Sequence, residues 1–85
     1  MKITVRLFGA FRPLGERIEF DLRNGDTLKE LRDQMQIHLQ NRDPDLAKRN
    51  LLAISRFSDE TTILPEDTVL QDSQVLAILP PVSGG

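Results

Sequence analysis

Two segments near the start of the chain alternate between apolar and polar residues. In residues 2–8 and 17–22 the apolar side chains fall at every second position (Ile3, Val5, Leu7, Ile18, Phe20 and Leu22). This period is typical of a strand with one buried face. The intervening residues 9–15 carry a glycine at each end and a proline between them, which indicates a loop. We therefore predict an antiparallel hairpin. Phe8 falls on its polar face, where it can wrap an edge or contact a partner.

Residues 27–40 have the period of an amphipathic helix. Their apolar positions are spaced by three and four residues (Leu28, Leu31, Met35 and Leu39). Thr27 and Glu30 fit a capping box, in which each side chain satisfies a free backbone amide at the helix start. After the helix, Asp43 and Pro44 fit the first positions of a short second helical turn that extends to about Arg49.

Two further apolar runs follow, at 51–57 and 75–79. The first is apolar on both sides over its first four residues, so we predict a strand near the middle of a sheet. The second is apolar at every position, which predicts a central strand beside the first strand and parallel to it. The polar segment 58–73 can hold a short strand at 61–64, a turn at 65–67 and a helical turn near 68–72.

This order of elements predicts an α+β domain. One long helix, at about 27–40, would pack on one face of a mixed sheet of four or five strands, as in the ubiquitin-like β-grasp roll. We expect residues 1–80 to form this domain and residues 81–85 to form an extended tail.

A sheet with one helix leaves its other face open. We assign alternate residues of the last strand, Val75, Ala77 and Leu79, to the core side. Leu76 and Ile78 then fall on the open face, and with Phe8 they would form a partner-binding surface, because clustered exposed apolar groups usually mark one. The alternative is that segment 58–73 covers this face.

Composition excludes several kinds of chemistry. The net charge of −2 gives no basic footprint for nucleic acid or an anionic membrane. No apolar run approaches the roughly 20 residues of a membrane span, and the first residues begin a strand pattern, so we expect a cytoplasmic protein. The chain has no cysteine and a single histidine, His38. Thiolate nucleophiles, disulfides and two-histidine zinc sites are therefore excluded, and we expect no metal.

The last strand runs into Pro80-Pro81-Val82-Ser83-Gly84-Gly85. The two prolines end the strand and hold the next residues extended. The glycines can pass a constriction that a Cβ would block. With no side-chain site to assemble, we take the Gly85 carboxylate as the reactive group and the preceding residues as a segment that enters a partner's channel. The alternative is an unordered terminus.

These residues resemble a known family. The stretch Leu79–Gly85 is similar to the end of the small subunits of molybdopterin synthase, in the MoaD and ThiS family of ubiquitin-like sulfur carriers. The stretches Asp26–Leu31 and Leu51–Ile54 support the resemblance. It implies that an E1-like enzyme uses ATP to adenylate Gly85, and that a sulfur donor such as a cysteine desulfurase or rhodanese converts the product into a thiocarboxylate.

The resemblance also implies a partner and a pathway. A large subunit would supply the catalytic residues, and two copies of each subunit would form a heterotetramer. The thiocarboxylate would donate sulfur to precursor Z in molybdenum cofactor biosynthesis, with no cofactor bound permanently. The alternatives are a ubiquitin-like modifier joined to lysines through Gly85, a sulfur carrier for thiamine or tRNA thiolation, and an interaction module with an inert tail.

Overall fold

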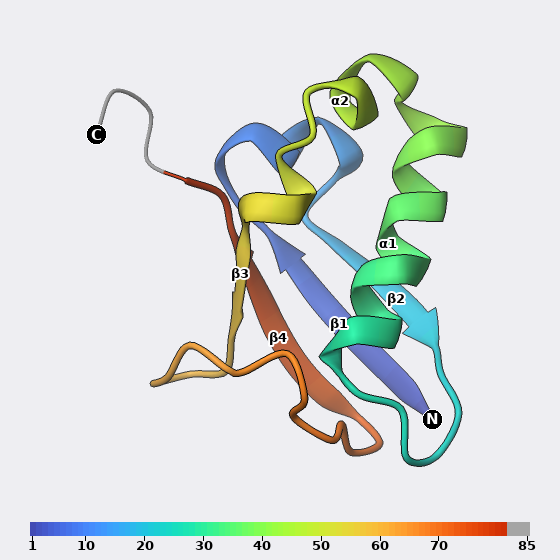
Figure 1. The fold of residues 1–85 in the computed structure, drawn as a ribbon, viewed down its shortest axis with the longest axis vertical. Coiled ribbons are helices and arrows are strands. Elements are labelled where there is room, and N and C mark those ends of the chain that lie inside the picture. Colours follow the sequence, from blue (N-terminus) through green and yellow to red (C-terminus); the bar gives the residue numbers. More distant parts are fainter. Residues whose placement is uncertain (82–85) are drawn as a thin grey trace.

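The computed structural model describes residues 1–81 and contains a single four-stranded sheet with a helix across one face (Figure 1). The strands are β1 (Lys2–Leu7), β2 (Arg17–Asp21), β3 (Arg56–Ser58) and β4 (Gln74–Leu79), in the order β2-β1-β4-β3. β1 is antiparallel to its neighbour β2 and parallel to its neighbour β4, and β3 is antiparallel to β4. This is the mixed sheet of the β-grasp roll, with β4 in a central position as predicted.

The main helix, α1 (Leu28–Arg42), forms where the apolar period predicts it. Its four apolar stripe residues are all buried against the sheet. The predicted capping box is present, with the Glu30 carboxylate accepting from the Thr27 backbone N–H at 2.8 Å. A second short helix, α2 (Pro44–Lys48), follows as predicted. Neither of these helices, nor any other in residues 1–81, is long and apolar enough to cross a membrane.

The predicted third strand at 51–57 is wrong over most of its length. Residues Leu52–Ile54 form the 3-10 helix η2, and β3 is short and lies at the sheet edge. The backbone carbonyls of this segment find partners outside the sheet. The Ser55 hydroxyl donates to the Leu51 carbonyl at 2.7 Å, and the Arg32 guanidinium donates to the Leu52 carbonyl. Periodicity alone does not separate a short buried helix from a strand.

Two loops also differ from expectation. The segment 9–15 contains the 3-10 helix η1 (Gly9–Leu14), which buries Phe11 completely. In the segment 58–73, neither the predicted strand at 61–64 nor the predicted helical turn near 68–72 forms. The segment bonds instead to the start of α1 (Leu28 N–H to the Thr68 carbonyl, 3.1 Å, and Leu70 N–H to the Asp26 carbonyl, 2.9 Å).

The two faces of β4 are opposite to the sequence-based assignment. Leu76 and Ile78 are 1% and 0% exposed, whereas Val75 and Leu79 are 52% and 37% exposed. The reason is the parallel register, in which Leu76 pairs with Val5 and Ile78 pairs with Leu7 of β1. Paired residues share a face, and β1 buries its apolar residues against α1. An all-apolar strand does not reveal this parity in its own sequence.

Candidate functional site

The candidate site is the end of the sheet where β4 runs into Pro80 and Pro81 (Figure 1). The carboxyl end of β4 is held on both sides, since Ile78 pairs with Leu7 of β1 and Leu79 pairs with Arg56 of β3. Pro80 is half-buried and Pro81 is exposed. Central pairing therefore fixes the base of the tail. The predicted channel residues (Val82, Ser83 and Gly84) and the predicted reactive residue Gly85 lie outside the described residues.

Gly9 provides a close-fitting seat for Pro80. It has a φ of 56°, a left-handed conformation that suits glycine, and a Cβ at this position would lie 2.8 Å from the Pro80 Cγ. The fully buried Phe11 anchors the helix η1 that Gly9 begins. In the sequence, Gly9 indicates only the start of a loop. Its contact with Pro80 joins two distant segments, and no local pattern signals it.

The open face of the sheet carries an apolar stripe along β4. Its members are Val75, Ala77 and Leu79, which stand on the side opposite α1. The predicted surface residues Leu76 and Ile78 lie in the core and cannot contact a partner. Val75 and Leu79 remain exposed, so segment 58–73 does not cover these two residues, although its Asp59 and Glu60 line a hollow beside Val75 and Ala77.

Phe8, the third predicted surface residue, is half-buried at the end of β1. The Arg6 guanidinium lies 5.3 Å from the centre of its ring, a cation–π arrangement. At the other end of the open face, the Lys2 ammonium lies 3.1 Å from the Glu19 carboxylate, and this hydrogen-bonded contact raises the pKa of Lys2. The open face is therefore apolar along β4 and polar or charged along β1 and β2.

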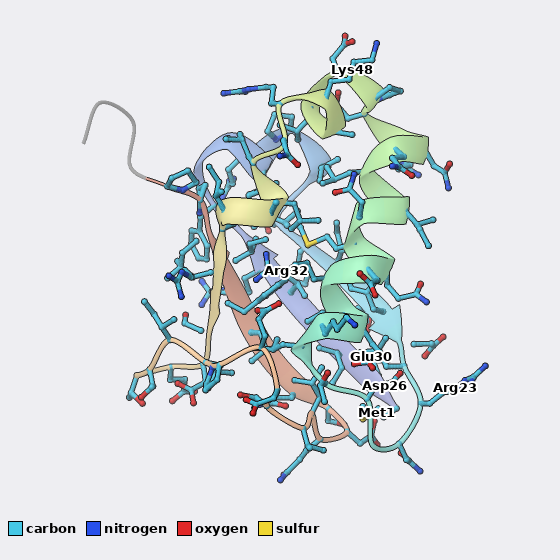
Figure 2. All side chains as sticks on the ribbon, in the orientation of Figure 1. Met1, Arg23, Asp26, Glu30, Arg32 and Lys48 are labelled. Carbon is cyan, nitrogen blue, oxygen red and sulfur yellow. The ribbon has the colours of Figure 1, made fainter. Side chains whose placement is uncertain are left out.

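Arg32 of α1 lies between this helix and the β3 edge of the sheet (Figure 2). Its Nε and Nη2 donate to the two Glu66 carboxylate oxygens at 2.8 Å each, and its guanidinium lies 5.0 Å from the Phe57 ring centre. A third bond reaches the Leu52 carbonyl. The hydrogen bonds from Arg32 lower the pKa of Glu66. One side chain thus ties together α1, η2, β3 and the loop that follows.

His38 lies at the border between the buried and the exposed face of α1, as its position in the apolar pattern predicted. Its ring packs edge-on against Phe20 with 6.0 Å between ring centres. Burial lowers its pKa, and the nearby Arg42 charge adds to this effect. Within residues 1–81, no three acidic or histidine side chains gather in a way that could hold a metal ion.

Comparison with solved structures supports the fold. SAMP1 from Haloferax volcanii aligns with a TM-score of 0.73 at 18% identity over 100% of both chains. A putative molybdopterin converting factor subunit 1 from Pyrococcus furiosus aligns with a TM-score of 0.71 at 22% identity, covering 96% of this chain and 99% of that one. These two likenesses establish a shared β-grasp architecture.

A third structure is closer in sequence. It is the complex of subunits 1 and 2 of the molybdopterin-converting factor from Helicobacter pylori, with a TM-score of 0.61, 30% identity and 100% coverage of both chains. Among curated proteins, none matches the chain significantly in sequence. A family model described as "ThiS family" matches residues 5–85. The match spans the sheet, the helix and the tail, and the chain therefore belongs to the ThiS family.

Proposed function

We propose that the chain is a sulfur carrier and serves as the small subunit of a molybdopterin synthase. The observation that supports this most strongly is the full-length, 30% identical alignment with a chain of the Helicobacter pylori complex of molybdopterin-converting factor subunits 1 and 2. The family match through residue 85 includes the whole tail. Together they favour a carrier whose end is delivered to a larger catalytic subunit.

In this proposal the Gly85 carboxylate is the reactive group. A carboxylate is a poor electrophile, because its oxygen is a poor leaving group. Attack of one carboxylate oxygen on the α-phosphorus of ATP releases pyrophosphate and forms an acyl-adenylate. The outer sulfur of a donor persulfide then attacks the acyl carbon and AMP leaves, which forms an acyl disulfide with the donor cysteine. A thiol reductant attacks the donor cysteine sulfur and breaks the S–S bond, so that the thiocarboxylate is released and the donor cysteine is left in a disulfide with that thiol. The chain has no cysteine to hold sulfur itself, so the acyl carbon is the available carrier atom.

The proposed partners follow from the same scheme. An E1-like adenylyltransferase would activate Gly85, and a cysteine desulfurase or rhodanese would provide sulfur. The large synthase subunit would supply the catalytic groups and receive the tail, in an assembly with two copies of each subunit. The stripe of Val75, Ala77 and Leu79, which is exposed at Val75 and Leu79 and half-buried at Ala77, is a suitable docking surface, since it is apolar and leads directly into Pro80.

Intact mass spectrometry tests the proposal. The chain is incubated with an activating enzyme, ATP and a sulfur donor, and we expect one oxygen to be exchanged for sulfur at the terminus. Deletion of Gly85, or addition of one residue after it, should abolish the exchange and leave the urea midpoint of the fold unchanged. Sulfur incorporation in either variant would contradict the assignment of Gly85.

The same acyl-adenylate can also react with a lysine amine, which would make the chain a protein modifier. Isopeptide-linked Gly-Gly remnants on cellular proteins, found without a thiocarboxylate form of the chain, would favour that function. A thiocarboxylate that restores molybdopterin formation with the large subunit would favour the carrier. Restoration of thiamine formation or tRNA thiolation instead would place the carrier in another pathway.

A further inference from the structure

One rung of the open sheet face is electrostatically unfavourable. Arg6 of β1 stands directly opposite Arg17 of β2, and both are exposed. Like charges at directly opposed positions destabilise a sheet. The other charged rung of this strand pair is favourable, because it sets Lys2 opposite Asp21. The unfavourable rung is the one nearest to the tail.

The carboxylate side chains near the two arginines are those of Glu16, Asp59 and Glu60. Within residues 1–81 neither Arg6 nor Arg17 forms an ion pair. Asp59 and Glu60 line a hollow beside Arg6 on the β4 side. The Asp59 carboxylate is already engaged, since it accepts the backbone N–H groups of residues 61 and 62 at 2.9 and 2.8 Å. These bonds lower the pKa of Asp59 and keep it charged within its own turn.

A third arginine joins the pair. Arg12 of η1 lines a second hollow together with Arg6, Arg17, Phe8 and Glu16. The cluster of Arg6, Arg12 and Arg17 is a local exception in a chain whose net charge is −2. An arginine guanidinium can bind a carboxylate through two parallel hydrogen bonds, so three of them together form a surface that fits an acidic partner.

The arginine cluster is continuous with the base of the tail. Arg6 pairs in register with Ala77 of the apolar stripe. Arg12 belongs to η1, whose first residue, Gly9, contacts Pro80. A protein that receives the tail and covers the stripe would therefore also cover the cluster. The carboxylates of that protein must then lie on the side of the tail where β1 and β2 are.

We propose that Arg6, Arg12 and Arg17 form a docking patch for carboxylates at the mouth of the channel that receives the tail. This inference rests on the proposed function for the identity of that receiving protein. In the free chain, the repulsion between Arg6 and Arg17 lowers stability. Partner carboxylates remove it on binding, and their long-range attraction speeds the encounter.

The test compares a triple variant, Arg6→Gln, Arg12→Gln and Arg17→Gln, with a control triple of equal charge change. The control substitutes three other exposed cations, Arg23, Lys29 and Lys48, by glutamine. Arg23 lies at the far end of the sheet and Lys48 on α2, both away from the tail base (Figure 2). Association rates with the activating enzyme and with the large subunit are measured by stopped flow at low and high salt.

We expect the docking-patch triple to associate with the large subunit, which receives the tail, roughly tenfold more slowly than the native chain at low salt. The difference should shrink at high salt, because salt screens exposed charges. The control triple should change the rate much less. Equal effects of the two triples on association with the large subunit, or a rate with the large subunit that does not depend on salt, would overturn the proposal.

A stability measurement adds a readout that a purely structural role would not produce. Arg6→Gln alone should raise the urea midpoint of the free chain, because it removes the opposed like charge, while it slows association. A lowered midpoint would show that Arg6 serves the fold. Failure of the proposed function can be distinguished from failure of the docking patch. If the proposed function is wrong, sulfur is not incorporated while the docking kinetics are as expected. Failure of the docking patch appears as unchanged kinetics with sulfur incorporation intact.

Discussion

Replacement of Gly9 by alanine tests whether the seat under Pro80 directs the tail. The new Cβ would lie 2.8 Å from the Pro80 Cγ, and Gly9 has a φ of 56°. Gly25 provides a matched control, because its φ of 93° is also positive but a Cβ there meets nothing within 4 Å. The two substitutions therefore share the backbone strain and differ in the contact with the tail base.

The magnitudes follow from these distances. An L-residue in a left-handed conformation costs roughly 1–2 kcal/mol, so both variants should lose about that much stability. At Gly9 the carbon atoms must also separate to about 3.5 Å, which moves Pro80 or η1 by roughly 0.7 Å. Misplacement of a reacting group by about 1 Å can cost about 100-fold in rate. We therefore expect Gly9→Ala to slow thiocarboxylate formation by about tenfold or more.

The assay is a time course of sulfur incorporation by intact mass spectrometry, at a partner concentration that saturates the native chain. Urea unfolding of both variants is measured alongside it. Gly9→Ala should be slow in sulfur incorporation, whereas Gly25→Ala should match the native rate with a similar loss of stability. Equal rates for the two variants would refute the reasoning, because they would show that the seat does not control where the tail points.

Three further predictions concern stability and can be measured by urea unfolding. Leu76→Ala should lower the free energy of unfolding by roughly 2–5 kcal/mol, since it empties a core position. Val75→Ala on the open face should lower it much less. The reverse order would restore the sequence-based assignment of faces. Thr27→Ala should cost roughly 0.5–2 kcal/mol by removing a helix cap, and an unchanged midpoint would contradict the capping role. Hydrogen bonds from Arg32 hold the pKa of Glu66 below its ordinary value of 4.5. The charged pair therefore stabilises the fold fully above about pH 4.5, and its contribution is lost as the pH falls through the folded-state pKa. Because Glu66 is half exposed, Glu66→Gln should cost at most about 1 kcal/mol at pH 7 and less at pH 3.5, and a cost independent of pH would exclude the charged pair as its source.

Elements whose residues carry their own periodic pattern were predictable. The helix α1 has an apolar stripe at helical spacing and a capping box at its start, and both depend on neighbours within a few residues. The hairpin of β1 and β2 likewise follows from alternation of apolar and polar residues. In such a strand the polar residues mark the exposed face, so the buried face is known from the sequence. The end of β4 was also predictable, since two consecutive prolines cannot continue a strand.

The errors arose where the local pattern was uniform. β4 is apolar at every position, and only its register against β1 decides that Leu76 and Ile78 face α1. The run 51–54 is apolar on both sides for a different reason. It wraps the end of the core as η2, with its carbonyls bonded to Ser55 and Arg32 instead of to a neighbouring strand.

The sequence by itself determined the hairpin of β1 and β2, the capped helix α1 and the central position of the last strand. Each of those properties is signalled by a pattern within a few neighbouring residues, such as alternation, helical spacing or an unbroken apolar run. Tertiary structure alone decided which side of β4 is open, that Gly9 lies against Pro80, and that Arg6 stands opposite Arg17. The physical reason is that these are pairings between separate segments. A pairing register is set by how whole strands and helices fill the core together, and a shift of one residue reverses every side chain on a strand.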